Sequence, residues 1–186
     1  MILDTAVEFA SVRGLEELSI GGLAATVKMS KSGLFAHFGS KQELQLATVA
    51  EAWEIFESEV LLGPSFDSQG VLAGLLGRWL SFYEREVFAG GCFFVISAVE
   101  LADRQDAVSK ALADAVDRQT TALEAAVRSA IESGELAARK DPGQTAFALH
   151  SVLVNAESLF HVRHDKAVFH GARAAIGELL EVVPSS

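Results

Sequence analysis

The fold is decided by residues 19–43, which read SIGGLAATVKMSKSGLFAHFGSKQE. From Ile20 onward, apolar residues recur at offsets of 0, 3, 4 and 7, which is the spacing of one helical face. A second apolar set follows after a short interruption. Two short helices separated by a tight turn are therefore predicted, the first capped by Ser19 and the second beginning near Ser30. This helix-turn-helix, at about residues 19–38, is an arrangement that places its second helix in the major groove of DNA.

One face of the second helix is free of bulky aliphatic side chains. Its residues are small or can form hydrogen bonds, so this face can approach the edges of bases closely. The predicted contacts on this face are Ser30, Lys31, Ser32, Gly33 and His37. Lys28, which precedes the helix, is assigned to the phosphates of the DNA backbone.

The next segment, Ser40-Lys41-Gln42-Glu43, has the pattern of a capping box. In this motif the Ser hydroxyl accepts a hydrogen bond from the third helical amide, and the Glu side chain reaches back to the cap. A third helix should begin here. Lys41 would lie in its first turn, where unpaired amides and a partial positive charge already favour a phosphate oxygen.

Residues 30–44 resemble the signature of the tetracycline-repressor (TetR) family of bacterial transcriptional regulators. Upstream, residues 2–15 are similar to the first helix of that family and the glycine turn that ends it. Phe35 is also among the predicted DNA contacts; it stands where the family often has a Tyr and lacks the hydroxyl with which that Tyr could reach a phosphate. The specific motif covers roughly the first quarter of the chain, and the remainder resembles the family in helical character and length.

The resemblance implies an all-α fold of about nine helices. It has a three-helix DNA-binding domain at residues 1–46, followed by a helical ligand-binding and dimerisation domain at 47–186. The implied function is that of a ligand-responsive transcriptional regulator, acting as a repressor. Its implied partners are double-stranded DNA with a palindromic operator sequence, a second copy of the chain, and a small apolar effector.

The distribution of charge is compatible with DNA binding, although the formal net charge is −10 and the pI is about 4.9. Residues 1–50 contain four basic and five acidic side chains, a sum of −1, which leaves −9 for the remainder. All three lysines of this segment lie between positions 28 and 41. The predicted DNA face is thus locally positive while the acidic side chains lie elsewhere, which would orient the molecule on a polyanion. In the alternative interpretation, these lysines belong to an ordinary solvated surface.

Composition excludes several other classes of protein. No uncharged apolar run approaches the roughly 20 residues of a membrane span, and the longest candidate, 88–99, is too short. Asp4 and Glu8 interrupt the segment that a signal peptide would need to be apolar. A single Cys excludes an internal disulfide framework and a Cys-based zinc site. We therefore expect a cytoplasmic protein without a membrane partner.

Beyond Lys41 the sequence predicts almost continuous helix. Gly63-Pro64 is a stop signal, and Asp67 or Ser68 can cap the helix that follows. Gly134 is a predicted C-cap, and Asp141-Pro142 has the pattern of an N-cap and a first helical residue. The predicted helices span about 41–62, 68–88, 92–102, 107–134, 143–163 and 168–182.

The last two predicted helices carry more apolar residues than one packing face requires. In the TetR family the corresponding helices form a two-fold, four-helix dimer interface, and the resemblance implies the same here. A fully internal position in the core is the alternative. The predicted interface residues are Phe147, Val152, Leu159, Phe160, Ile176, Leu179 and Leu180.

The middle of the chain concentrates aromatic residues near a few isolated polar ones, which is the composition of a pocket for an apolar ligand. An aromatic run at helical spacing is also typical of core, and a lone Cys can act as a small hydrophobe. We expect part of this set to line a cavity. The candidates are Trp79, Phe82, Tyr83, Cys92, Phe93, Phe94, Glu100, His150 and Asn155.

Other chemistry has weaker support in the sequence. His161, His164 and His170 lie near a carboxylate in the sequence, and His161 and His164 would be neighbours on one helix. A metal site would need a third ligand beside this pair and supporting hydrogen bonds, so no metal or cofactor is predicted. Phosphate-binding glycine loops, nucleotide fingerprints and nucleophile elbows are absent from the sequence, and no enzyme activity is predicted. A helical enzyme or carboxylate-bridged metal bundle is the second hypothesis, and a helical adaptor is the third. Salt-dependent binding of a palindromic duplex would separate the first hypothesis from both.

Overall fold

The computed structural model describes residues 2–63, 70–138 and 140–180. Over these residues the chain forms nine α-helices and one π-helical turn, and contains no strand. The predicted all-α fold is therefore confirmed. The elements are α1 (Ile2–Arg13), α2 (Ile20–Thr26), α3 (Lys31–Phe38), α4 (Lys41–Phe56), η1 (Glu57–Leu61), α5 (Val71–Glu84), α6 (Phe93–Glu100), α7 (Ala107–Glu132), α8 (Pro142–Arg163) and α9 (Ala167–Leu180).

The described residues divide into two compact units. Unit 1 contains 2–57 and 86–116, and unit 2 contains 58–63, 70–85, 117–138 and 140–180. The long helix α7 contributes to both, because its residues up to 116 belong to unit 1 and the following ones to unit 2. Among the described residues, no helix combines the length and apolar character that a membrane crossing needs.

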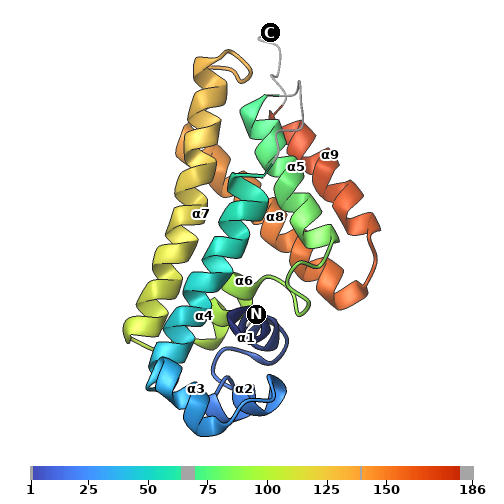
Figure 1. Ribbon diagram of the computed structural model, residues 1–186. Helices are drawn as coiled ribbons and strands as arrows, with labels where there is room; N and C mark the ends of the chain where they lie inside the picture. Colours follow the sequence, from blue (N-terminus) through green and yellow to red (C-terminus); the bar gives the residue numbers. More distant parts are fainter. Residues whose placement is uncertain (1, 64–69, 139, 181–186) are drawn as a thin grey trace. The chain divides into compact units, whose positions relative to one another are not determined.

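In unit 1, α1 packs against α4 and α6, and α2 lies beside α3 (Figure 1). Leucine side chains form the core of the three-helix start, where Leu23, Leu34 and Leu44 from α2, α3 and α4 are fully buried. A second cluster is aromatic. The rings of Phe93 and Phe94 are 5.4 Å apart, and Phe56 of α4 lies 5.8 Å from Phe94. These contacts attach α6 to the helix that follows the recognition motif.

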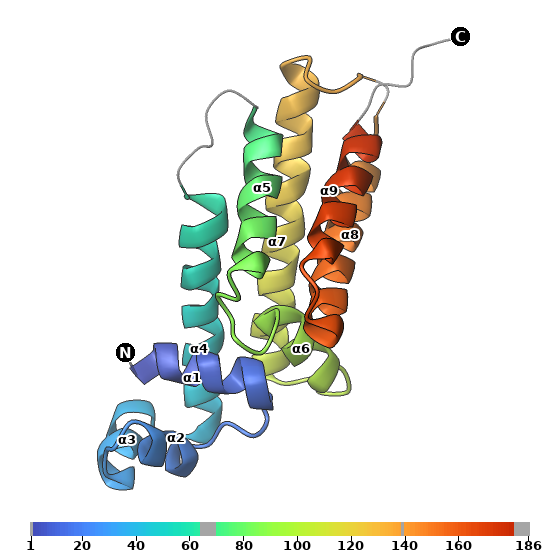
Figure 2. The same cartoon turned by 90° about the vertical axis from the view of Figure 1, so that its right-hand side faces the viewer.

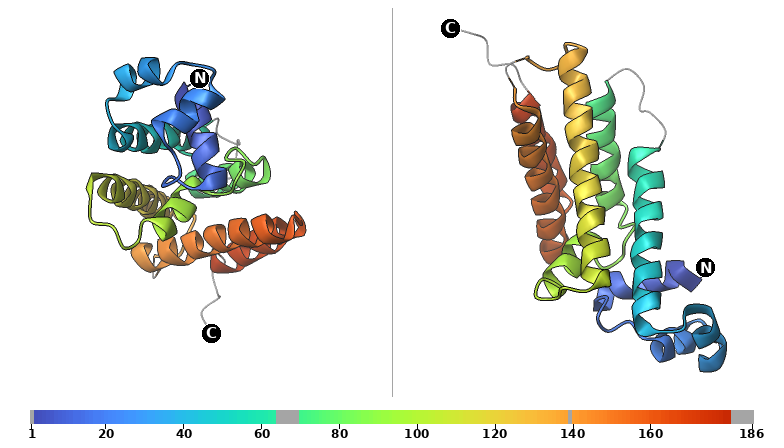
Figure 3. Two further views of the ribbon diagram at one scale, coloured as in Figure 1. Left: turned by 90° about the horizontal axis from the view of Figure 1, so that it is seen from below. Right: turned by 90° about the vertical axis from the view of Figure 1, so that its left-hand side faces the viewer.

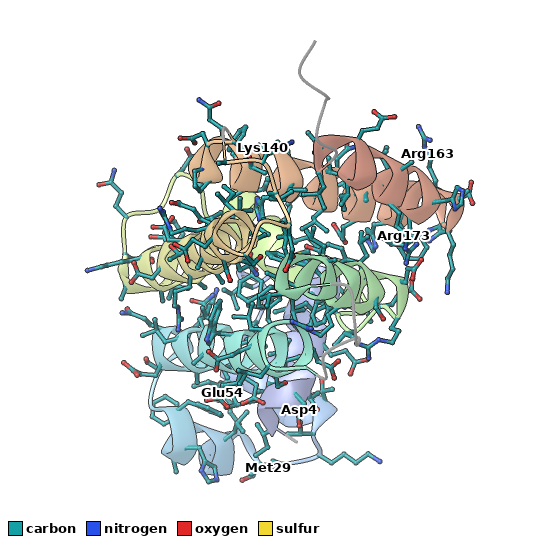
Figure 4. All side chains as sticks on the ribbon, turned by 90° about the horizontal axis from the view of Figure 1, so that it is seen from above. Asp4, Met29, Glu54, Lys140, Arg163 and Arg173 are labelled. Atoms are coloured by element: carbon teal, nitrogen blue, oxygen red, sulfur yellow. The ribbon has the colours of Figure 1, made fainter. Side chains whose placement is uncertain are left out.

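In unit 2, α8 and α9 lie side by side as an antiparallel pair (Figures 2 and 3). Their connecting turn follows His164, whose φ of 53° ends α8 in the left-handed region. The rings of Phe160 and Phe169 are 4.9 Å apart across this pair. Arg173 of α9, labelled in Figure 4, donates two hydrogen bonds of 3.0 and 2.8 Å to Glu84 of α5. Helix α5 thus joins the pair by packing on α8 and by this ion pair.

Predicted helix ends agree with the structure where the signal is local. The carboxylate of Asp141 accepts from the backbone N–H of Gln144 at 2.7 Å, and Gly134 has a φ of 82° after the end of α7. The helix predicted over about 41–62 is helical as far as Leu61, although its last part, after Phe56, is the π-helical turn η1. The predicted end of the last helix, at residue 182, lies outside the described residues.

The helix predicted over 68–88 needs correction, because α5 begins at Val71 and ends at Glu84. Its predicted caps, at 67 and 68, and the stop at 64 lie outside the described residues. Gly70 precedes the helix without a side-chain cap. The early end has a local cause: Glu86 has a φ of 51°, a left-handed conformation that does not continue an α-helix.

Candidate nucleic-acid interface

Serine caps begin both helices of the predicted reading motif. The Ser19 hydroxyl accepts from the N–H of Gly22 at 3.1 Å, and the Ser30 hydroxyl accepts from the N–H of Gly33 at 3.0 Å. Between the helices, Lys28 has a φ of 56°, and its left-handed conformation makes the turn. The predicted cap at Ser19 is therefore confirmed, and Ser30 caps the second helix, which was expected to begin near this residue. The structure positions α3 through one buried anchor, Leu34, and through this capped start.

The predicted reading face of α3 is open to solvent. Lys31, Ser32 and His37 are exposed, and Phe35 exposes 53% of its surface. Ser30 is also exposed, and its hydroxyl lies 3.3 Å from the hydroxyl of Ser32. A helix with this composition presents donors, acceptors and the rings of Phe35 and His37 to a neighbouring surface. Such groups recognise base edges and thymine methyl groups in a major groove.

Two further candidates flank the reading face. Lys28 is exposed in the turn before α3, next to Met29, which is labelled in Figure 4. Gly33, in contrast, is half-buried. The exposed ring of His37 lies 6.4 Å from the ring of Phe38 at a tilt of 55°, so packing between the two rings is loose.

The N-terminus of α4 carries the third cap of the motif and the last candidate for DNA contact. The Ser40 hydroxyl accepts from the N–H of Glu43 at 3.0 Å, as predicted. The ammonium group of Lys41 donates to the carboxylate of Glu16 at 2.8 Å, and also to the backbone carbonyl of the same residue. The other carboxylate oxygen of Glu16 accepts from the guanidinium of Arg104. The sequence interpretation missed this pairing, because Glu16 lies 25 positions before Lys41 and no periodic pattern joins the two.

The turn between α1 and α2 is held from both sides. The N–H of Leu15 donates to the carboxylate of Glu100 on α6 at 2.7 Å, and its carbonyl accepts from the amide of Gln45 on α4 at 2.7 Å. Gln45 is buried, and Gly14 in the same turn has a φ of 92°. A side chain at Gly14 would lie 2.3 Å from the carboxylate of Glu100. Glu100, a candidate for the ligand pocket, therefore binds the backbone of this turn.

The other pocket candidates divide between the two units. In unit 2, the indole N–H of Trp79 donates to the hydroxyl of Tyr83 at 2.8 Å, and the ring of His150 stands edge-on to Trp79 at 5.8 Å. Burial lowers the pKa of His150. These three residues, from α5 and α8, form an aromatic cluster with a titratable ring. The buried ring of Phe82 lies 6.0 Å from that of Tyr83.

Three candidates of unit 1 are buried, whereas Glu100 is exposed. Cys92, Phe93 and Phe94 expose 3% or less of their surface, and the two phenylalanines belong to the aromatic cluster around α6. Asn155 is different, because it is exposed and lies on the surface of α8.

A groove of about 430 Å³ runs between α8 and α9. Two interface candidates, Val152 and Leu159, line it together with Asn155. Small residues also line it, namely Ala156, Gly171, Ala172 and Ala175.

The remaining interface candidates differ in exposure. Phe147 exposes 76% of its surface, and Leu179 and Leu180 are partly exposed. Phe160 and Ile176 are buried within unit 2 itself, at 6% and 7% exposure. The exposed or partly exposed candidates therefore include Phe147 on α8 and Leu179 and Leu180 at the end of α9.

The rings of His161 and His164 are 6.3 Å apart at the end of α8. Among the described residues there is no group of three or more His, Cys, Asp or Glu side chains arranged to hold a metal ion.

Two family models match the chain. Residues 2–48 match the model of bacterial regulatory proteins, tetR family, and residues 71–176 match that of the tetracyclin repressor-like C-terminal domain. No significant match was found among curated protein sequences.

Solved structures of the same fold cover nearly the whole chain. A TetR transcriptional regulator from Chloroflexus aurantiacus is 20% identical with a TM-score of 0.84, over 95% of this chain and 90% of that one. A TetR-family regulator from Agrobacterium tumefaciens is 17% identical with a TM-score of 0.83, over 97% and 96% of the two chains. AibR, solved in complex with isovaleryl coenzyme A and operator DNA, is 22% identical with a TM-score of 0.73, over 96% of each chain.

Proposed function

Because the chain belongs to the TetR family of bacterial transcriptional regulators, we propose that it is a ligand-responsive repressor that binds a palindromic operator as a homodimer. The observation that carries this proposal is the exposed, serine-capped face of α3. We assign DNA reading to residues 1–46, and effector binding and dimerisation to 47–186. The proposal gives the chain no catalytic role, and it places the protein in the cytoplasm with its DNA.

In the proposed complex, the exposed residues of α3 and its cap read bases in the major groove. Phosphate contact falls to Lys28 and Lys41, which lie before α3 and at the start of α4. Base contacts confer sequence preference, whereas phosphate contacts set register and release counterions. The base-reading set is Ser30, Lys31, Ser32, Gly33, Phe35 and His37.

Dimerisation is assigned to the α8–α9 pair. The groove between these helices is lined by Val152 and Leu159, and a second copy can fill it with its own α8 and α9. Burying the exposed ring of Phe147 and the edges of Leu179 and Leu180 would add apolar area to the contact. Two-fold symmetry would then present two copies of α3 to half-sites about 34 Å apart.

The effector is proposed to be a small, largely apolar molecule. AibR, which has the same fold, has been solved with isovaleryl coenzyme A and operator DNA together. In this chain, Trp79, Tyr83 and His150 lie together in unit 2 as an aromatic cluster with a few polar atoms. To lower the affinity for the operator tenfold, an effector must prefer the conformation that does not bind DNA by about 1.4 kcal/mol.

The experiment is a selection of operator sequences by the full chain from a random pool of duplexes. Enriched palindromes, bound with a steep dependence on salt by a species that sediments as a dimer, would support the proposal. Lys31→Ala should weaken binding and flatten the plot of log K against log salt by about one unit if Lys31 also touches phosphate. Lys166→Ala, an exposed lysine between α8 and α9, is the matched control and should leave the slope unchanged.

The competing outcomes are equally clear. A chain that enriches no palindrome, or whose binding is insensitive to salt, would refute the DNA-reading role. Effector binding is tested by a thermal-shift screen of apolar metabolites, followed by operator titration with each compound that stabilises the chain. Operator binding that is indifferent to every stabilising compound would refute ligand control while leaving DNA binding intact.

A further inference from the structure

The carboxylate of Glu16 is shared between two cations of unit 1. One oxygen accepts from the ammonium of Lys41 at 2.8 Å, and the other accepts from the guanidinium of Arg104. The backbone carbonyl of Glu16 also accepts from Lys41. An ammonium group has three protons to donate, and two of them are thus used within the chain. The lysine proposed for phosphate contact is already bound to an anion.

Arg104 is itself fixed from the far side. Its Nε donates to the carboxylate of Asp106 at 2.7 Å, and a second nitrogen of the guanidinium contacts the same oxygen. The other oxygen of Asp106 caps α7, because it accepts from the N–H groups of Val108 and Ser109 at 3.0 Å each. A continuous series of polar contacts therefore runs from the N-terminus of α7 through Arg104 and Glu16 to the N-terminus of α4.

A carboxylate and a phosphate can bind at the same position at the start of α4. Both are anions, and both are favoured by the ammonium of Lys41 and by the unpaired amides of the first helical turn. The hydrogen bond from Lys41, followed by the charges of Lys41 and Arg104, lowers the pKa of Glu16, so this carboxylate is ionised at neutral pH. A phosphate that binds Lys41 must displace Glu16 or share the ammonium with it.

We propose that Glu16 competes with DNA phosphate for Lys41, and that Arg104 sets the strength of this competition by holding Glu16 from the other side. The inference rests on the proposed contact between Lys41 and phosphate. Glu16 and Arg104 act as positioning residues for DNA binding, since neither needs to touch the DNA. Any shift of the α6–α7 loop that loosens Arg104 from Glu16 leaves Lys41 as the remaining cation paired with this carboxylate and weakens DNA binding.

The test compares Glu16→Gln with Glu17→Gln. Glu17 is the adjacent exposed carboxylate of the same turn, and it forms no ion pair with another described residue, so it controls for the general effect of removing a negative charge near DNA. Two probes are titrated at several salt concentrations: the operator duplex selected by the wild-type chain, and a mixed-sequence duplex of the same length. Glu16→Gln should tighten binding to both about two- to fivefold, the range expected for an exposed ion pair, and steepen the salt slope by up to about one unit. Glu17→Gln should change binding less than this.

Double-mutant cycles assign the effect to Lys41. In a Lys41→Ala background, Glu16→Gln should no longer tighten binding. Arg104→Met should weaken binding in the wild-type background and have no such effect in the Glu16→Gln background. Melting temperatures of all variants separate these changes from loss of folding, and Arg104→Lys provides a milder variant that retains the charge.

The outcomes separate the two proposals. A wild-type chain that binds DNA, with Glu16→Gln and Glu17→Gln indistinguishable, would overturn the competition while leaving the proposed function standing. Tightening by Glu16→Gln that persists without Lys41 would overturn it as well. A wild-type chain that binds neither duplex would overturn the proposed function and the competition together.

Discussion

Replacing Gly90 by Ala should destabilise the chain through a single backbone clash. Gly90 is buried in the turn before α6, and its N–H donates to the hydroxyl of Ser11 on α1 at 3.2 Å. A Cβ at this position would lie 1.9 Å from the carbonyl oxygen of Ser11 and 2.5 Å from the Cα of Val12. Both atoms belong to the backbone of α1, so neither can rotate away as a flexible side chain would.

The magnitude follows from the size of the overlap. Real Cβ atoms do not approach another heavy atom closer than 3.0 Å, so the turn and α1 must separate by about 1 Å. Overpacking of this kind costs about 1–3 kcal/mol, and weakening the hydrogen bond to Ser11 adds about 1 kcal/mol. The sum is about 2–4 kcal/mol. For a chain of this length, each kcal/mol lowers the melting temperature by about 2–4 °C.

Calorimetry of wild type and variant measures the shift directly, and urea midpoints provide a second measure. Gly77→Ala is the matched control, because a Cβ at Gly77 on the exposed side of α5 meets nothing within 4 Å. That change should stabilise the chain by about 0.5–1 kcal/mol through helix propensity. If Gly90→Ala melted at or above the wild-type temperature, the close approach of the turn to α1 would be refuted.

Three further predictions concern the cap, the interface and a buried histidine. Ser30→Ala should cost about 1 kcal/mol by removing the cap of α3 and should loosen operator binding in a fluorescence titration, while retaining a fold that melts cooperatively. Leu179→Asp would bury an unpaired carboxylate and should convert the dimer into a monomer or prevent folding, which sedimentation velocity would show. The control is Glu178→Ala at the exposed neighbouring position, which should remain dimeric. A dimeric Leu179→Asp variant would exclude α9 from the interface. Burial lowers the pKa of His150 below its ordinary value of 6.5, so the unfolded chain binds the proton more tightly than the folded chain. The free energy of unfolding should therefore be greatest above pH 6.5 and decrease as the pH falls below it. In His150→Gln the fall of the urea midpoint between pH 7.5 and 5.5 should shrink, and an unchanged fall would assign the pH dependence to other groups.

The features predicted correctly from sequence are local. Ser19, Ser40 and Asp141 were expected as caps, and each accepts from the N–H three residues ahead. A cap requires a short polar side chain at the right offset from a helical pattern, and both are visible in the sequence. The same holds for the solvent-exposed face of α3, because helical periodicity separates it from the buried Leu34.

The features that the sequence could not predict depend on tertiary packing. Glu16 and Lys41 are 25 positions apart, and Leu15 and Glu100 are 85 apart, so nothing in the local pattern selects these partners. Glu100 was expected at a ligand pocket, where an isolated carboxylate among apolar residues would be informative. The structure uses it to bind the N–H of Leu15, whose own turn leaves that donor without a helical partner.

The two activities of the proposed regulator differ in how far the sequence determines them, and the reason is physical. B-DNA presents the same groove to every reading helix, so a few consecutive residues of α3 suffice to describe the contact. An effector has no fixed shape, and its surroundings come from separate helices, as the contact between Trp79 of α5 and His150 of α8 illustrates. The chemistry of that cluster still limits what can bind. A ligand placed beside Trp79 and Tyr83 must bury apolar surface, and an anionic group on it could pair with His150 only if this ring took up a proton, which its burial disfavours.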